Sequence, residues 1–236
     1  MRTHGVQCLL MGGQACVFYG AAEFSRDTDL AILSSSDNLK CFRAALAGLD
    51  AECIAAPPFQ PEYLLRGHAV HFRCHHPDAA GMRIDVMSVM RGVAPFDRLW
   101  ARRTTIQTAD GDAYDLLSLA DLVQAKKTQR DRDWPMLRRL VEADYLQYRA
   151  QSTPGHIEFW LNQLRTPVLL VELAVRHPDV AADVARHRPL VAFAVAGNPI
   201  AVEGALAVEE ATERDADRRY WQPLRAELET LRHRRP

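Results

Sequence analysis

The sequence predicts an α+β protein, in which a mixed β-sheet flanked by helices is followed by a helical C-terminal region. Segments typical of strands, either short and apolar or alternating, all lie before Arg91. From about Asp115 onward, apolar residues instead recur at helical spacing. Prolines then separate successive helical stretches, at Pro167, Pro178, Pro189 and Pro199.

The beginning of the chain reads as strand, helix, strand and helix. Gln7–Met11 is an apolar run that ends at the pair Gly12-Gly13, which indicates a buried strand entering a turn. The following apolar spacing predicts a helix, a strand and a second helix, over Gln14–Ala22, Thr28–Leu33 and Asn38–Leu49. Asp37 is the expected N-cap of the second helix.

Two alternating segments predict a β-hairpin over Ala69–His75 and Met82–Val89, joined by a turn at Pro77–Gly81. In the first segment, Val70, Phe72 and Cys74 share one face of the strand, and His71, Arg73 and His75 share the other. The register of the hairpin decides which of the polar residues lie beside Asp85 of the second segment.

The second half of the chain predicts helices that begin at recognisable caps. Ser118 and Asp121 resemble a capping box that opens a helix over Leu119–Thr128. Further helices begin near Asp133-Trp134-Pro135 and Ser152-Thr153-Pro154. We therefore expect two domains, a catalytic core over residues 1–115 and a helical region over residues 116–236.

Composition excludes several classes of protein. The 236 residues are 48% apolar and 25% charged, and 29 basic against 30 acidic side chains give a formal charge of −1, so no global basic field indicates nucleic acid. Apolar runs are far shorter than the roughly 20 residues of a membrane helix. Neither a signal peptide nor paired cysteine spacing is present, which favours a cytoplasmic protein with reduced thiols.

Three acidic residues form the most informative pattern in the sequence. Asp27 and Asp29 are two apart at the start of a predicted strand, so both carboxylates point to one face. Asp85 interrupts an otherwise apolar strand, where an acid is costly unless it is paired or binds a metal. If the two strands are neighbours, the three carboxylates converge on a site suited to Mg²⁺ or Mn²⁺.

The glycine pair supplies a second half of the predicted site. Gly12 and Gly13 lie between a strand and a helix start, where glycine allows the backbone to approach a phosphate closely. Ser25 precedes the acids and offers a hydroxyl to a phosphate oxygen.

Together these residues resemble the DNA polymerase β-like nucleotidyltransferase superfamily, whose signature is a Gly-Gly or Gly-Ser pair followed by Asp-x-Asp on a strand. The surrounding sequence looks most like the minimal nucleotidyltransferases and AbiEii-type proteins of bacterial toxin–antitoxin and phage-defence operons. The segment from Asp121 to Lys126 is similar to the helical motif in which those proteins carry a nucleotide-contacting lysine. The resemblance covers residues 7 to about 142.

The resemblance implies metal-dependent transfer of a nucleoside monophosphate from an NTP such as ATP to an acceptor hydroxyl, with release of pyrophosphate. Two Mg²⁺ or Mn²⁺ ions would be held by the acids, Asp27 and Asp29 binding both and Asp85 joining one and helping to deprotonate the acceptor. The nucleotide would be bound by Gly12, Gly13, Ser25 and Lys126. One departure is that many active relatives have Ser where this chain has Gly13.

Several alternatives stay open at this point. The acceptor is an RNA end, a protein hydroxyl or a small molecule such as an antibiotic. RNA would need a local basic patch, for which the sequence offers Arg98, Arg102, Arg103, Lys126, Lys127, Arg130 and Arg132. A different class of function is a non-catalytic nucleotidyltransferase-fold protein that binds a partner subunit from the same operon.

Overall fold

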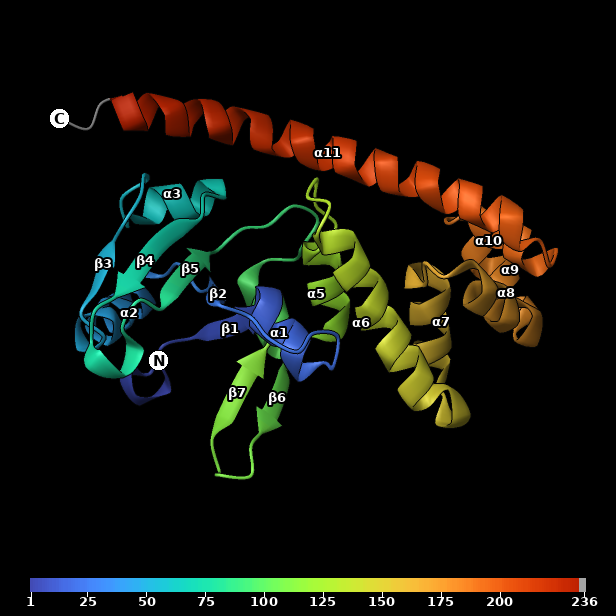
Figure 1. Ribbon diagram of the computed structural model, residues 1–236, viewed down its shortest axis with the longest axis horizontal. Coiled ribbons are helices and arrows are strands. Elements are labelled where there is room, and N and C mark those ends of the chain that lie inside the picture. The colour runs from blue at the N-terminus through green and yellow to red at the C-terminus, as the bar shows by residue number, and fades with distance from the viewer. Residues whose placement is uncertain (234–236) are drawn as a thin grey trace. The chain divides into compact units, whose positions relative to one another are not determined.

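The computed structural model describes residues 1–233 and contains one seven-stranded mixed sheet with the strand order β3-β4-β5-β2-β1-β7-β6 (Figure 1). Its strands are β1 (Cys8–Met11), β2 (Asp27–Ile32), β3 (Ala51–Cys53), β4 (Val70–Cys74), β5 (Arg83–Met87), β6 (Thr104–Gln107) and β7 (Ala113–Leu116). The pairs β2–β5 and β1–β7 are parallel, and the other neighbouring strands are antiparallel.

Alternation along the strands separates an apolar face from a polar one. In β5, Ile84 and Val86 are fully buried, whereas the residues between and beside them are partly exposed. Phe72 of β4 points to the same face as Ile84 and contacts Phe42 of helix α2 (Ser36–Gly48), with ring centroids 6.1 Å apart. Helix α2 therefore covers the apolar face, and Asp85 emerges on the opposite one.

Short helices lie between strands, namely α1 (Gly12–Phe18), α3 (Pro61–Arg66) and α4 (Phe96–Ala101), and a fourth, α5 (Leu119–Ala125), follows the last strand. The N-cap of α2 is Ser35, whose side chain accepts a hydrogen bond from the Asn38 amide. The prediction that Asp37 caps this helix was wrong because the helix begins earlier, which places Asp37 in its first turn. Where α5 begins, the Asp121 amide donates to Ser118 Oγ as in a capping box, but the Asp121 carboxylate accepts from the Ser118 hydroxyl instead of from its backbone amide.

The C-terminal part of the described chain is helical. It contains α6 (Asp133–Tyr148), α7 (Pro154–Gln163), α8 (Pro167–Arg176), α9 (Pro178–Ala185), α10 (Leu190–Val195) and α11 (Pro199–His233). Prolines begin α7, α8, α9 and α11, where the missing N–H costs nothing. Thr153 caps α7 through a capping box with His156. The predicted α+β class and helical C-terminal region are confirmed.

Two compact units make up the chain. The sheet unit comprises Met1–Phe18, Ala22–Ala125 and the part from Arg219 onward, and the helical unit comprises Tyr19–Ala21 and Lys126–Arg218. The predicted domain division at residues 115 and 116 stays a prediction.

The sequence did not reveal every element. The hairpin of β6 and β7 was not predicted, because each of its strands is only four residues long; it lies where a domain boundary was expected. The predicted hairpin of β4 and β5 is confirmed, with a short 3₁₀ turn over Pro77–Ala79 between its strands. Within residues 1–233, no helix combines the length and apolar character that crossing a membrane requires.

Candidate active site

Three carboxylate-bearing residues lie close together on the polar face of the sheet. Strands β2 and β5 run parallel in a register that places Asp29 directly opposite Asp85. Asp27 is two residues before Asp29, so its side chain leaves β2 on the same face. Neighbouring strands are about 4.8 Å apart, which makes this pairing a close approach of like charges. The adjacency of the two strands is the condition that the sequence-based hypothesis required.

Gly12 lies directly against one of these acids. Its φ of +66° is in the left-handed region, and a Cβ built on it would lie 1.8 Å from Asp29 Oδ2. No side chain fits into that distance, so glycine is required both by the backbone conformation and by the close approach. The backbone of Gly12 and the carboxylate of Asp29 are thus in direct contact.

Gly13 approaches the loop before β2 in a similar way. A Cβ built on Gly13 would lie 2.4 Å from Ser25 Oγ, and the Ser25 hydroxyl donates a hydrogen bond to the Asp27 carbonyl oxygen at 3.1 Å. The glycine pair, Ser25 and the Asp27–Asp29 segment therefore pack together locally. The positions that a Cβ would take at the two glycines are already occupied by the side chains of Asp29 and Ser25.

Asp85 is held by two basic side chains. Its Oδ1 accepts a hydrogen bond from Arg83 Nε at 2.8 Å and lies 2.8 Å from His71 Nδ1. Arg83 Nη2 also lies 3.1 Å from His71 Nδ1, so the three side chains contact one another. Within the described residues, Asp85 Oδ2 makes no hydrogen bond to protein. One oxygen is thus anchored and the other is left for a ligand.

The charges around Asp85 keep it ionised. Burial raises the pKa of Asp85, but hydrogen bonds from His71 and Arg83, together with their charges, outweigh burial and lower the pKa below its ordinary value. The pKa of Arg83 is raised, first by its hydrogen bond to Asp85 and further by attraction to Asp85, Asp27 and Asp29, although burial opposes this. The guanidinium therefore interacts with all three acids.

Lys126 belongs to the helical unit, unlike the other predicted site residues. Its Nζ lies 3.1 Å from Asp133 Oδ1, and both side chains are largely buried. Thr128 also donates a hydrogen bond to Asp133, at 2.6 Å. In the structure, Lys126 is thus part of an ion pair at the start of α6, and its predicted contact with nucleotide stays a prediction.

The residues of the polar face suit a hard divalent cation. Carboxylate oxygens are the ligands that Mg²⁺ prefers. Among residues 1–233, no three His, Cys, Asp or Glu side chains are already grouped as ligands of one metal ion. Asp85 directs one oxygen to Arg83 and His71, so a bound metal would have to share or replace those contacts.

Arg83 is the site residue that the sequence analysis missed. It precedes Asp85 by two residues in a strand, so alternation alone places both on one face. His71 was left undecided, and the β4–β5 register pairs it with Asp85. The spacing Arg-x-Asp in an alternating strand was the available signal for Arg83.

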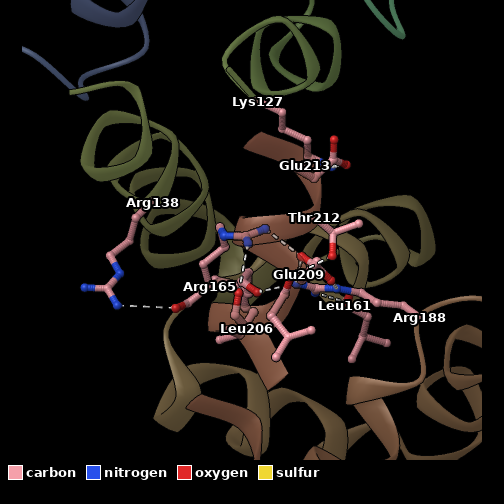
Figure 2. Close-up of polar contacts among 11 residues, drawn as sticks. Lys127, Arg138, Leu161, Arg165, Arg188, Leu206, Glu209, Thr212 and Glu213 are labelled. Carbon is pink, nitrogen blue, oxygen red and sulfur yellow. Dashed lines mark hydrogen bonds and ion pairs between the residues drawn. The ribbon is translucent and has the colours of Figure 1, made fainter. Parts of the chain in front are cut away.

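A second charged cluster lies in the helical unit (Figure 2). Arg165 and Arg188 direct their guanidinium groups at the carboxylate of Glu209, with N–O distances of 2.6 Å and 2.9 Å. Arg188 also donates hydrogen bonds to the carbonyl oxygens of Leu161 and Leu164. Lys127 lies near Glu213, at 4.0 Å. These contacts tie α11 to the segments around α7 and α10.

Comparison with known proteins does not assign the chain to a group. No family model matches it, and no curated protein matches it.

Proposed function

We propose that the chain is a metal-dependent nucleotidyltransferase, which moves a nucleoside monophosphate from an NTP to an acceptor hydroxyl. The observation that carries the proposal is the β2–β5 register, since it brings Asp29 and Asp85 together from distant parts of the sequence. Gly12 and Gly13 begin α1 beside these acids, and in the proposal their backbone amides would donate hydrogen bonds to the phosphate chain.

The chemistry is an in-line displacement at the α-phosphorus. The acceptor oxygen forms a bond to that phosphorus, the bond to the bridging oxygen of the β-phosphate breaks, and pyrophosphate leaves. Magnesium bound to the acids would neutralise charge on the transferring and leaving oxygens. Asp27, Asp29 and Asp85 would hold the metal, and the family resemblance implies that Asp85 would also help to deprotonate the acceptor hydroxyl.

The nucleotide would be held by backbone rather than by side chains at the turn after β1. Asp29 and Ser25 pack directly against Gly12 and Gly13, so a triphosphate bound by the glycine amides would lie beside the Asp29 carboxylate and the Ser25 hydroxyl. Ser25 already donates to the Asp27 carbonyl oxygen, so its hydroxyl would have to change partner to donate to phosphate. Lys126 is included in the proposal only through the family resemblance.

The acceptor is an RNA end, a protein or a small molecule in this proposal. Ion pairs disfavour the basic patch that RNA would require, because four of its seven cations already face carboxylates: Arg102 with Asp121, Arg103 with Asp115, Lys126 with Asp133 and Lys127 with Glu213. A partner subunit from the same operon and a cytoplasmic location stay predictions.

Transfer of radiolabel from α-labelled NTPs tests the proposal. Purified protein is incubated with Mg²⁺ and, separately, with total RNA, a protein lysate and aminoglycosides. We expect labelling of one acceptor class, loss on chelation, and a reduction of at least about 10³-fold in Asp27→Asn plus Asp29→Asn, as for removal of metal ligands. Asp78→Asn, at an exposed acid outside the site, is the matched control. Equal labelling by the double variant, or no labelling with any NTP, contradicts the proposal.

A further inference from the structure

A cavity of about 550 Å³ lies within the helical unit, between α6 and the part of α11 that belongs to this unit. Its remaining wall comes from Arg165 and Pro167, near the start of α8. Cavities of roughly 300–1,000 Å³ enclose ligands of small-molecule size. The proposed nucleotidyl transfer uses none of the residues that line this cavity, so it is a separate candidate site.

The acids that line the cavity are mostly engaged by donors of the protein itself. Four arginines and four acidic residues contribute to the lining, so their formal charges cancel. Two of the acids share Arg214, which donates to Glu210 Oε1 from Nε at 2.9 Å and to Asp131 from Nη1. A third, Glu142, accepts a hydrogen bond from the Thr166 hydroxyl. Hydrogen-bonding capacity, and not net charge, therefore decides which ligand the cavity suits.

Two of the lining arginines keep donors that no acceptor of the protein uses. The Arg138 side chain is 53% exposed, lies 4.0 Å from Glu142, and donates a hydrogen bond to the Arg165 carbonyl oxygen at 3.4 Å (Figure 2). Arg139, exposed on the same helix, has no hydrogen bond or ion pair within residues 1–233. A guanidinium presents its N–H groups in a planar fork that matches a carboxylate or a phosphate. Arg138 and Arg139 can therefore bind an anion.

The rest of the lining offers apolar contact instead of charge. Arg165 is 6% exposed, and its guanidinium binds Glu209 at 2.6 Å and lies 4.6 Å from the centroid of the Trp134 ring. Its charge is thus occupied inside the unit. Pro167 and Leu206 add apolar surface to the cavity. A ligand that places its charged group at Arg138 and Arg139 would need an apolar body to match these neighbours.

We propose that the cavity binds a small organic anion, whose carboxylate or phosphate group is held by Arg138 and Arg139 and whose apolar body contacts Pro167 and Leu206. Glu203 is the lining acid that opposes this charge, because it has no hydrogen bond or ion pair in the described part of the chain. The inference does not depend on the proposed function, since all of these residues belong to the helical unit.

Isothermal titration calorimetry of the full-length protein tests the inference, with benzoate and phenyl phosphate as anionic probes and benzamidine as a cation of similar shape. We expect at least one of the anions to bind at one site per chain, and benzamidine not to bind. Arg138→Gln plus Arg139→Gln should raise the Kd at least about tenfold, as for the loss of a charge-assisted hydrogen bond. Arg98→Gln plus Arg149→Gln, which removes two exposed arginines elsewhere, is the matched control and should change the Kd less than about twofold.

The probe that binds identifies the charged group of the ligand, a carboxylate for benzoate and a phosphate for phenyl phosphate. The inference is overturned if neither anion binds, if benzamidine binds as tightly, or if the double variant Arg138→Gln plus Arg139→Gln keeps the Kd of the wild type. Glu203→Gln removes the opposing charge, so a higher Kd in this variant also overturns it. If the double variant does not fold, as judged by circular dichroism, Ala207→Phe should weaken binding instead by filling the cavity from an exposed position of α11.

Discussion

The two charged clusters of this chain are built on opposite principles. On the polar face of the sheet, three carboxylates share the guanidinium of Arg83, and the acids are only partly buried. In the helical unit, Arg165 and Arg188 share one carboxylate, and both arginine side chains are nearly inaccessible to solvent, at 6% and 7% exposed. One cluster is composed mainly of partly exposed acids, and the other has its arginine side chains enclosed.

The two clusters differ in whether their charged groups can still bind a ligand. Hydrogen bonds to Glu209 and to main-chain carbonyls occupy the guanidinium of Arg188, so that cluster acts as a support. In the sheet unit, the hydrogen bonds of Asp85 are made by Oδ1, and the backbone of Gly12 lies in contact with the Asp29 carboxylate. Charged groups that are fully paired with one another serve as structural supports. Charged groups that are only partly paired keep affinity for another molecule.

The largest expected effect is in the helical cluster. Glu209→Gln leaves two buried guanidinium groups without their counter-ion, so we expect the free energy of unfolding to fall by about 3–5 kcal/mol. Urea titration followed by tryptophan fluorescence measures the change, since Trp134 and Trp160 are buried in this unit. Glu203→Gln, at an exposed acid of the same helix, should change stability by less than about 0.5 kcal/mol. Equal changes in the free energy of unfolding for the two variants would contradict the structural role of Glu209.

A smaller effect is expected at the glycine that touches Asp29. Gly5 and Gly12 both have φ of +66°, but a Cβ on Gly5 meets nothing within 4 Å in the described structure. Gly5→Ala therefore isolates the backbone cost, about 1 kcal/mol. Gly12→Ala should cost at least about 2 kcal/mol more, because the methyl group displaces the Asp29 carboxylate. Urea titration of both variants checks this, and equal costs would mean that the carboxylate moves aside freely.

The smallest effect has the opposite sign. Asp27→Asn removes one of three like charges, so without divalent metal we expect unfolding to require up to about 1 kcal/mol more free energy. Thermal melts in the presence of a chelator measure the gain, and Asp78→Asn serves as the surface control. If Asp27→Asn instead lowers the free energy of unfolding by more than about 1 kcal/mol, Asp27 stabilises the fold, as Glu209 does, and the expectation of charge repulsion is wrong.

Local patterns in the sequence predicted several strands of the sheet and the face on which each acid of the site lies. Alternation in the segment that became β5 places Asp85 opposite the apolar face, and the spacing of Asp27 and Asp29 places both on one side of β2. The glycine pair marked the turn after β1. These features depend on residues two to four positions apart, which sequence periodicity reports directly.

Contacts between residues far apart in the sequence depend on the tertiary structure. Nothing local to β2 or β5 indicates that Asp29 pairs with Asp85, or that Arg83 faces Asp27, because strand register depends on the packing of the whole sheet. The same holds for Glu209, whose two arginines come from segments 44 and 21 residues away. Charges act through space, so their partners follow from the fold and not from the order of residues.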